Sequence, residues 1–496
     1  MRTRTFKRLI GLALVATLAS CGGSGNSTSN NQPSPPSAAT PQTTIGKIAG
    51  FGSVFVNGVE FDTTGASYDV NGTAASGDDA LHVGMVVKVQ GSVNADGRTG
   101  KCDRISYDSD VNGVVQDLVT DTVDPNIKTF TVFGVSIRAD MGSTNFEGKD
   151  DPAFSFDTIA NGDHVEVSGE FDGDVLVASF IEKQAASDNT YEAKGKVDQY
   201  NGSDQFVLVL RNGATLNVTV DAGAELPSSG VMDGQYVEIR GTIPDPVNAP
   251  DSILASKVEL KYSDRMGDGD HKDVEVRGVL NHDTDTDTWS VMDVQLVFSD
   301  STEFSPSDLA DKIADLSADG LYVEVEGQYV NDALQVHKIS LQQDNFEFEG
   351  DVESVTATDA HDGSVTLSFG SAVGTVDVNI TPDTMFLEDR AWDHYDLSSV
   401  MAGDKVEIKA RKADDGMLYA SKLHREDHAG YKVDGPVDAI DDVSITLAGV
   451  TFTVDANTRF ENGTPAVGDY VEVEDHDGDA SWKVWRNRGS MKVAEI

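Results

Sequence analysis

The sequence predicts an all-β protein, a tandem array of about six small antiparallel barrels of the OB-like or Greek-key kind behind a disordered N-terminal tether. Three observations predict this class. Short runs of alternating apolar and polar residues recur between glycines, segments with helical spacing are scarce, and one strand phrase returns six times within the 496 residues. A chain of this length exceeds what one hydrophobic core supports, so several domains are expected.

The first element is an export signal over residues 1–20. Basic residues among the first eight precede an apolar run from Leu9 to Ala19, which has about half of the roughly 20 residues that a membrane-spanning helix needs. The segment Leu18-Ala-Ser-Cys21 resembles the bacterial lipobox, and this resemblance implies acylation of the Cys21 thiol, cleavage before Cys21 and acylation of the new amino group. Several acyl chains would anchor the protein stably in a membrane. An ordinary signal with an incidental cysteine is the alternative.

The second element, residues 21–43, is the expected tether. It is built mainly from Gly, Ser, Asn, Pro, Gln and Thr, so it has almost nothing to bury. The coil relation for flexible chains puts the first domain roughly 25 Å from the anchor. Gly22 rather than aspartate follows the anchor, which by resemblance to Gram-negative lipoproteins points to the outer membrane, on a face that the sequence leaves open.

The exported part is strongly acidic. The formal net charge of −47 becomes −51 when residues 1–20 are removed, because that segment holds four basic residues and no acid. A field of this sign repels phosphate backbones and anionic headgroups, so we expect no nucleic-acid partner and no electrostatic binding to membranes. Cation capture and plain solubility both fit the charge, and solubility is the favoured interpretation.

The strand phrase Gly-x-x-Val-x-Val-x-Gly defines the repeats. A turn glycine followed by alternating apolar and charged residues is typical of a half-buried strand, with the valines inward and the Glu or Lys side chains in water. The last two copies lack the final glycine. The copies begin at Gly84, Gly162, Gly234, Gly320, Gly403 and Gly468.

A hairpin precedes the strand phrase in each repeat. Two short strands meet at Gly58, Gly134 and Gly449, and glycine takes the positive φ that tight hairpin turns need. In the fourth repeat Asp293 holds this position, and aspartate also tolerates that geometry. The third and fifth copies are longer, around Gly213 and Gly374.

A third unit closes each repeat, as in Ala178-Ser-Phe-Ile181 and Ala255-Ser-Lys-Val258. In the first repeat this slot begins with Cys102, where a small apolar residue is expected, so we interpret Cys102 as a buried, inert thiol rather than a nucleophile. With Cys21 acylated it is the only cysteine left, and no intramolecular disulfide can form.

A glycine-bearing strand opens each repeat, and the recurring units together set the boundaries. Spacings of 67 to 85 residues between the opening glycines suit independent barrels of five or six strands, whose closure removes exposed sheet edges. One helix is expected, over 307–316. The expected repeats are 44–109, 110–185, 190–262, 273–343, 345–427 and 430–496.

These phrases resemble the bacterial family of domains of unknown function numbered 5666, whose members are commonly exported lipoproteins with tandem copies. Gly50-Phe-Gly-Ser-Val-Phe-Val-Asn-Gly-Val-Glu-Phe61 is the closest match, and the resemblance covers nearly everything after the tether. The fifth and sixth copies depart from the pattern at the final glycine of the strand phrase. The resemblance implies tandem domains and supplies no catalytic residues.

Three acidic clusters in expected loops suit the hard oxygen chemistry of Ca²⁺, although none completes an EF-hand loop. Val294 stands where an EF-hand that began at Asp283 would need its bidentate glutamate. Solvated turns are the favoured interpretation and weak Ca²⁺ sites the alternative, and no other cofactor is expected. The candidate ligands are Asp268, Asp270, Asp283, Asp285, Asp287, Asp475, Asp477 and Asp479.

The sequence carries no motif for catalysis. Its ten histidines are scattered, and it contains neither a His-Glu-x-x-His pair, a Gly-x-Ser-x-Gly elbow nor a phosphate loop. The aromatic stretches Trp392–Tyr395 and Trp482–Trp485 could stack on sugar rings, but core positions are favoured. Six divergent copies of one domain favour a repeated spacer or binding surface, because a single active site gains nothing from being copied.

The sequence therefore predicts a non-enzymatic, lipid-anchored protein of the cell envelope. It would be exported, attached to the outer membrane through Cys21 and used as a multi-domain β stalk or binding module, with polysaccharide or an envelope protein as partner. A Ca²⁺-stabilised surface adhesion protein is the first alternative. The second is a hydrolase of envelope polymers, with paired carboxylates about 5 to 9.5 Å apart.

Overall fold

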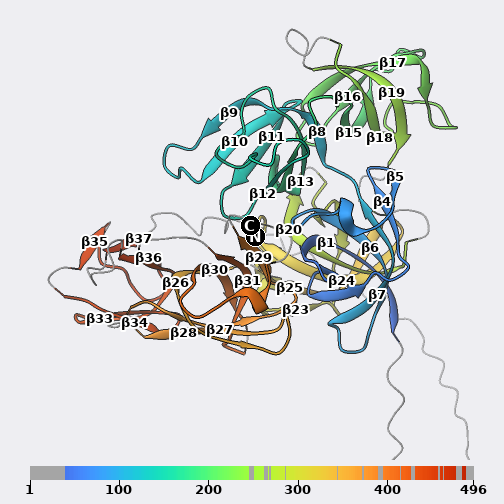
Figure 1. Ribbon diagram of the computed structural model, residues 1–496. Coiled ribbons are helices and arrows are strands. Elements are labelled where there is room, and N and C mark those ends of the chain that lie inside the picture. Colours follow the sequence, from blue (N-terminus) through green and yellow to red (C-terminus); the bar gives the residue numbers. More distant parts are fainter. Residues whose placement is uncertain are drawn as a thin grey trace, which may run out of the picture. The chain divides into compact units, whose positions relative to one another are not determined.

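The computed structural model describes most of the chain after the expected tether. Strands form nearly all of its regular structure (Figure 1), so the all-β prediction is confirmed. The export signal and Cys21 lie outside the described residues, and no helix among the described residues is long and apolar enough to cross a membrane. The described residues are 39–244, 251–261, 266, 270–284, 286–342, 344–370, 374–388, 395–413, 415–425, 430–455, 458–461, 463–475 and 483–486.

The first repeat shows the order of strand pairing. Strand β1 (Thr40–Gly50) pairs with β2 (Val54–Val56), and β2 pairs with β3 (Val59–Asp62), in both cases antiparallel. Strand β3 runs parallel to β7 (Thr99–Tyr107), which is antiparallel to β6 (Val86–Val93). Strand β6 is antiparallel to β1, so the series of pairs returns to its start. The first residues of β1, Thr40–Thr43, were expected in the tether and belong to the sheet because they pair with β6.

The remaining elements follow the same order in the later repeats. The first repeat also contains β4 (Ser67–Val70), β5 (Thr73–Ala75) and η1 (Asp78–Ala80). The second contains β8 (Val111–Val114), β9 (Gln116–Thr120), β10 (Ile127–Val132), β11 (Val135–Asp140), β12 (Asn145–Gly148), β13 (His164–Asp172) and β14 (Val175–Lys183). The third contains β15 (Tyr191–Asp198), β16 (Gln205–Val209), β17 (Thr215–Glu225), β18 (Tyr236–Thr242) and β19 (Ser252–Leu260).

The second half of the chain continues the pattern. The fourth repeat contains β20 (Asp273–Asp283), β21 (Thr288–Val291), β22 (Val294–Val297), β23 (Glu303–Ser305), α1 (Leu309–Ala314), β24 (Tyr322–Val330) and β25 (Ala333–Leu341). The fifth contains β26 (Phe346–Ala357), β27 (Gly363–Ser368), β28 (Thr375–Ile380), β29 (Met385–Glu388), η2 (Leu397–Ser399), β30 (Lys405–Lys412) and β31 (Leu418–Arg425). The sixth contains β32 (Tyr431–Ile440), β33 (Ser444–Leu447), β34 (Val450–Thr453), β35 (Arg459–Glu461), β36 (Tyr470–Asp475) and β37 (Lys483–Arg486). The helix predicted over 307–316 is present and shorter, as α1.

Every repeat contains parallel strand pairs, where antiparallel barrels were expected. In the first five repeats the parallel pairs that close the ring are β3–β7, β11–β14, β17–β19, β22–β25 and β28–β31. Further parallel pairs are β4–β7, β12–β14, β23–β25, β29–β31 and β35–β37. The reason is geometric: when five strands pair in a ring, an odd number cannot alternate in direction all the way round, so two neighbours must run the same way. These two neighbours are the second strand of the hairpin and the last strand of the repeat.

The tight hairpin turns have the geometry that the sequence predicts. Gly58 and Gly134 have φ of 79° and 77°, and Asp293 has φ of 66° in the same position. The preceding residues also have positive φ, at 51° for both Asn57 and Phe133. Two successive residues with positive φ match the right-handed twist of the flanking strands.

The final glycine of the strand phrase marks a β-bulge. The register shifts at Gly91, Gly169, Gly241 and Gly327, each time because an extra residue enters the partner strand. A Cβ at Gly241 would lie 2.1 Å from the carbonyl oxygen of Leu254, so a side chain would need the backbone to move. In the fifth repeat the same bulge is formed with Ala410.

Each repeat pairs with one other repeat through its first strand, and we call these pairings seams. In the first seam β1 runs parallel to β20, which joins the first and fourth repeats. In the second, β8 is antiparallel to β15, and in the third β26 is antiparallel to β32. The first strands therefore do not remain as open sheet edges, since the two repeats at a seam share one sheet.

The apolar cores follow these pairs of repeats. One buried cluster runs through the second and third repeats, and another runs through the fifth and sixth. Cys102 lies fully buried in the cluster of the first repeat, and burial raises the pKa of its thiol to about 12. The prediction that Cys102 occupies a core position is confirmed.

Candidate functional site

Two glutamates of the strand phrase are buried, and for these the sequence expectation is wrong. Val-Glu-Val alternation was expected to place these carboxylates in water. Instead Glu166 and Glu238 are 4% and 2% exposed. The reason is tertiary: the second face of the strand lies under a seam or against another repeat, so both faces are covered.

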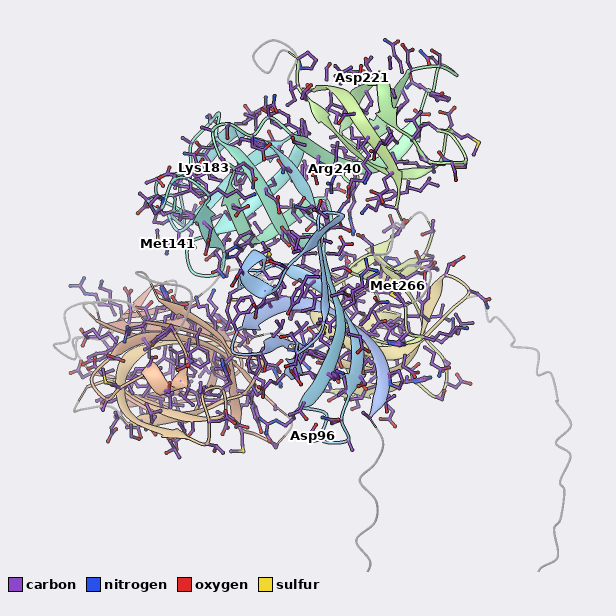
Figure 2. All side chains as sticks on the ribbon, turned by 45° about the vertical axis from the view of Figure 1, so that its right-hand side comes forward. Asp96, Met141, Lys183, Asp221, Arg240 and Met266 are labelled. Atoms are coloured by element: carbon purple, nitrogen blue, oxygen red, sulfur yellow. The ribbon has the colours of Figure 1, made fainter. Side chains whose placement is uncertain are left out.

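In the second seam the buried carboxylate of Glu238 is surrounded by cations. The ammonium groups of Lys261 and Lys194 lie 3.4 and 3.8 Å from its Oε2, and the guanidinium of Arg240, labelled in Figure 2, lies 3.2 Å from Oε1. Arg240 also pairs with Glu192 on β15, at 3.1 Å. Burial raises the pKa of Glu192 to about 7, although Arg240 opposes the rise.

The first seam also contains polar and charged side chains that contact one another. Gln42 donates a 2.9 Å hydrogen bond to Glu275 across the β1–β20 pairing. Burial, together with the neighbouring Glu324 carboxylate, raises the pKa of Glu275 to about 8. Arg277 pairs with Glu324 and lies 2.6 Å from Asp383 of the fifth repeat. Arg277 therefore links the fourth repeat to the fifth.

Sequence reasoning missed this network, although a signal for it was present. The first strands of three repeats read Glu192-Ala-Lys-Gly195, Glu275-Val-Arg-Gly278 and Glu347-Phe-Glu-Gly350. Their charges face the Glu of the strand phrase on the neighbouring strand, as in the pairing of Lys194 with Glu238. In the third and fourth repeats, reading the two phrases as a charge-matched pair would have predicted these ion pairs, whereas in the fifth Glu349 lies opposite Glu407.

One cavity gathers residues from four repeats. It has a volume of about 110 Å³, and its lining comes from the first, second, fourth and fifth repeats. Five cations and two carboxylates face it in a chain whose net charge is −47, and we call it the basic cavity. Its charged lining residues are Lys47, Arg277, Lys409, Arg411, Lys422, Asp344 and Asp383.

Polar groups of the basic cavity are partly unpaired. Oδ2 of Asp344 accepts a hydrogen bond from the hydroxyl of Ser421, whereas the buried Oδ1 has no partner. Oγ of Ser143 is also buried without a partner. Burial raises the pKa of Asp344, while the Ser421 hydrogen bond and the Lys409 ammonium oppose the rise. The basic cavity is thus a place in the described chain where polar groups from several repeats converge.

The predicted calcium ligands do not gather into one visible site. Asp268, Asp285, Asp477 and Asp479 lie outside the described residues. Asp270 is 2.8 Å from the Lys88 ammonium and accepts a 2.6 Å hydrogen bond from Gln90. Asp283 accepts a hydrogen bond from the Thr286 amide, and the exposed Asp287 lies 3.1 Å from the His282 ring.

The last described member of the acidic clusters, Asp475, is buried at the end of β36 opposite Tyr431. Within the described ranges no group of three or more His, Cys, Asp or Glu side chains is placed to hold a metal. Since every acidic cluster includes residues beyond those ranges, the Ca²⁺ sites stay a prediction.

Of the aromatic stretches, Tyr395 is buried and packs edge-on against Phe386, with ring centroids 6.0 Å apart. A core position was favoured for this residue and is confirmed. Trp392 and Trp482 lie outside the described residues.

The repeated pairing order and the shared seams define a multi-domain β protein made from tandem copies of one small domain. The comparison with known families agrees: the family described as a domain of unknown function (DUF5666) matches residues 44–105, 112–182, 277–339, 349–424 and 434–482. These segments cover well over half of the chain, so the chain belongs to this family. Residues 190–262 are not among the matches, yet β15 to β19 show the same pairing order as the first repeat.

No curated protein matches the chain. Among solved structures, a chain titled "drosophila Unr CSD456" is similar at 13% identity, over 49% of this chain and 99% of that one, with a TM-score of 0.12.

Proposed function

We propose that this protein is a non-enzymatic binding module of the cell envelope, exported and held at the outer membrane by acyl chains on Cys21. The observation that carries the proposal is the use of the repeated charges. Lys194 and Arg277, at equivalent strand positions, form ion pairs with Glu238 within the third repeat and with acids of the fourth and fifth repeats, respectively. Repetition therefore builds a scaffold, and the scaffold supplies a surface for a partner.

The seams favour a binding module over a stalk. The first repeat pairs with the fourth rather than with its neighbour in sequence. A stalk gains length when successive domains follow one another, whereas a pairing of distant repeats brings their residues to common sites such as the basic cavity. We propose an envelope polysaccharide or an envelope protein as the partner, and the net charge of −47 argues against nucleic acid.

The anchor is tested by metabolic labelling with radioactive palmitate followed by membrane fractionation. Wild-type protein should incorporate label and sediment with membranes. Cys21→Ser should lose both properties, while Cys102→Ala, which removes the other cysteine, should keep them. Label on the Cys21→Ser variant, or wild-type protein that stays in the soluble fraction, would refute the anchor.

Binding without catalysis is tested with purified envelope polysaccharide. The full-length chain should co-sediment with the polymer, and the chain length of the polymer should be unchanged after prolonged incubation. Shortening of the polymer would establish a hydrolase instead. Protease treatment of intact cells then locates the module on the outer or the periplasmic face.

A further inference from the structure

The basic cavity contains a set of polar groups that lack partners. Oδ1 of Asp344 and Oγ of Ser143 are buried and unpaired. The guanidinium of Arg411 lies 5.5 Å from the centroid of the Tyr419 ring, and no carboxylate of the described residues forms an ion pair with it. A buried unpaired polar group costs about 1 to 3 kcal/mol, so several around one cavity call for an occupant.

The other cations of the cavity are largely neutralised by neighbouring acids. Lys47 lies 3.3 Å from Glu170, Lys422 contacts Glu407, and Arg277 is held by two carboxylates. Lys409 lies 3.9 Å from Glu347, at the limit of an ion pair. Arg411 acts on the Asp344 carboxylate without forming an ion pair with it, and it is therefore the lining cation most available to a ligand.

The unpaired groups specify the chemistry of an occupant. Arg411 requires an anionic oxygen, for which its planar guanidinium is well suited. Oδ1 of Asp344 requires a hydrogen-bond donor, and the Ser143 hydroxyl can serve either role. One small group that offers anionic oxygens and a hydroxyl proton together is hydrogenphosphate.

The size of the cavity agrees with this chemistry. A volume of about 110 Å³ has room for a five-atom oxyanion. It is below the roughly 300 to 1,000 Å³ of pockets for drug-sized ligands.

We propose that the basic cavity binds inorganic hydrogenphosphate. Arg411 would pair with the anionic oxygens of hydrogenphosphate, and the Ser143 hydroxyl would donate a hydrogen bond to one of them. Oδ1 of Asp344 would accept a hydrogen bond from the P–OH group. Sulfate has no proton at neutral pH, so it would face the Asp344 carboxylate without a hydrogen bond and bind more weakly. This gives the proposed binding module a ligand class, and it rests on that proposal only for the biological use of the cavity.

The overall negative charge does not prevent such binding. At physiological ionic strength the field of distant charges is screened over about 8 Å, so the groups that line the cavity dominate the interaction. These lining groups include Arg411 and Lys409 beside the carboxylates of Asp344 and Asp383.

The test is isothermal titration calorimetry of the full-length chain at pH 7 with sodium phosphate and, at equal ionic strength, with sodium sulfate. Phosphate should bind, and sulfate should bind at least tenfold more weakly. Arg411→Gln should weaken phosphate binding at least tenfold. Lys312→Gln removes the same charge from the exposed helix α1 and should leave binding unchanged. Asp344→Asn should bring the affinities for phosphate and sulfate within about threefold, because the amide can donate to either anion.

Wild-type measurements alone can overturn the proposal, so a variant that fails to fold does not obscure the result. The absence of both binding heat and any rise in melting temperature at millimolar phosphate would refute it. Equal affinity of the wild type for the two anions would refute the role of Asp344. A failed titration leaves the palmitate and fractionation results untouched, so the cavity and the envelope role are tested separately.

Discussion

Glu347 of β26 lies directly opposite Asp434 of β32, so two carboxylates share the seam between the fifth and sixth repeats. The Lys432 ammonium lies 2.8 Å from Glu349 and 2.5 Å from Glu347 and separates these acids. Burial raises the pKa of Asp434 well above its usual range, even with Lys432 beside it. The seam is therefore an acidic cluster built around one cation.

Replacing that cation should destabilise the third seam. We expect Lys432→Met to lower the free energy of unfolding at pH 8 by about 3 to 5 kcal/mol, because it leaves buried carboxylates unneutralised. The loss should shrink at pH 5, where the acids can take up protons. Urea unfolding followed by tryptophan fluorescence suits the measurement, since three of the four tryptophans fall after residue 345. Lys312→Gln is the control, and an equal loss at both pH values would contradict the cluster.

Glu275 should make stability depend on pH. Its pKa is about 8 in the folded chain and about 4.3 when unfolded. Between these values the folded state holds a proton that the unfolded state has released, so stability falls as pH rises from about 4.5 to about 8, by at most about 1.4 kcal/mol per pH unit.

Glu275→Gln should flatten that slope. The difference in unfolding free energy between variant and wild type, measured in urea across this pH range, isolates the contribution of Glu275. Glu303→Gln changes an exposed carboxylate on β23 of the same repeat and should leave the slope as it is. A wild-type slope that survives in Glu275→Gln would show that another group is responsible.

The bulge glycine should resist substitution. Gly241→Ala places a Cβ 2.1 Å from the Leu254 carbonyl oxygen, and we expect a loss of about 1 to 3 kcal/mol from the forced backbone shift. Ala410→Gly at the equivalent bulge should cost no more than about 1 kcal/mol, the entropy of an added glycine. Gly77→Ala, with open space around the new methyl group, is the neutral control in the same thermal unfolding assay. A neutral Gly241→Ala would mean that the bulge adapts freely.

The Cys102 thiol should react very slowly with thiol reagents in the folded protein. Because the thiolate is the reactive form, full burial and a pKa of about 12 should slow its reaction with maleimide at pH 8 by at least about a hundredfold relative to the unfolded chain. Mass mapping of the peptide that contains Cys102 distinguishes it from Cys21. Rapid labelling of the native protein would show that the first repeat opens readily.

Calcium should have little effect if the acidic loops are solvated turns. Asp270 already pairs with Lys88, and Asp287 is 90% exposed, so we expect the melting temperature in Ca²⁺ and in EDTA to agree within about 1 °C. A clear rise in Ca²⁺ would favour the alternative of a calcium-stabilised adhesion protein.

Local sequence was enough to determine the strands, the hairpin turns and the core position of Cys102. These features depend on alternation, on positive φ and on small side chains, which are properties of a few consecutive residues. Asp293 could be placed in a turn from its neighbours alone, and the family resemblance rested on the same short phrases.

Tertiary structure decided which repeats pair and what happens to their charges. Nothing in the phrase around Glu238 distinguishes a carboxylate in water from one 2% exposed beside Lys194, because burial of the second face depends on what packs against it in the folded chain. The basic cavity follows the same rule, since Ser143, Arg277 and Asp344 come from different repeats. The sequence by itself determined the domain and its repetition, while the packing of the repeats against one another produced the seams and the basic cavity.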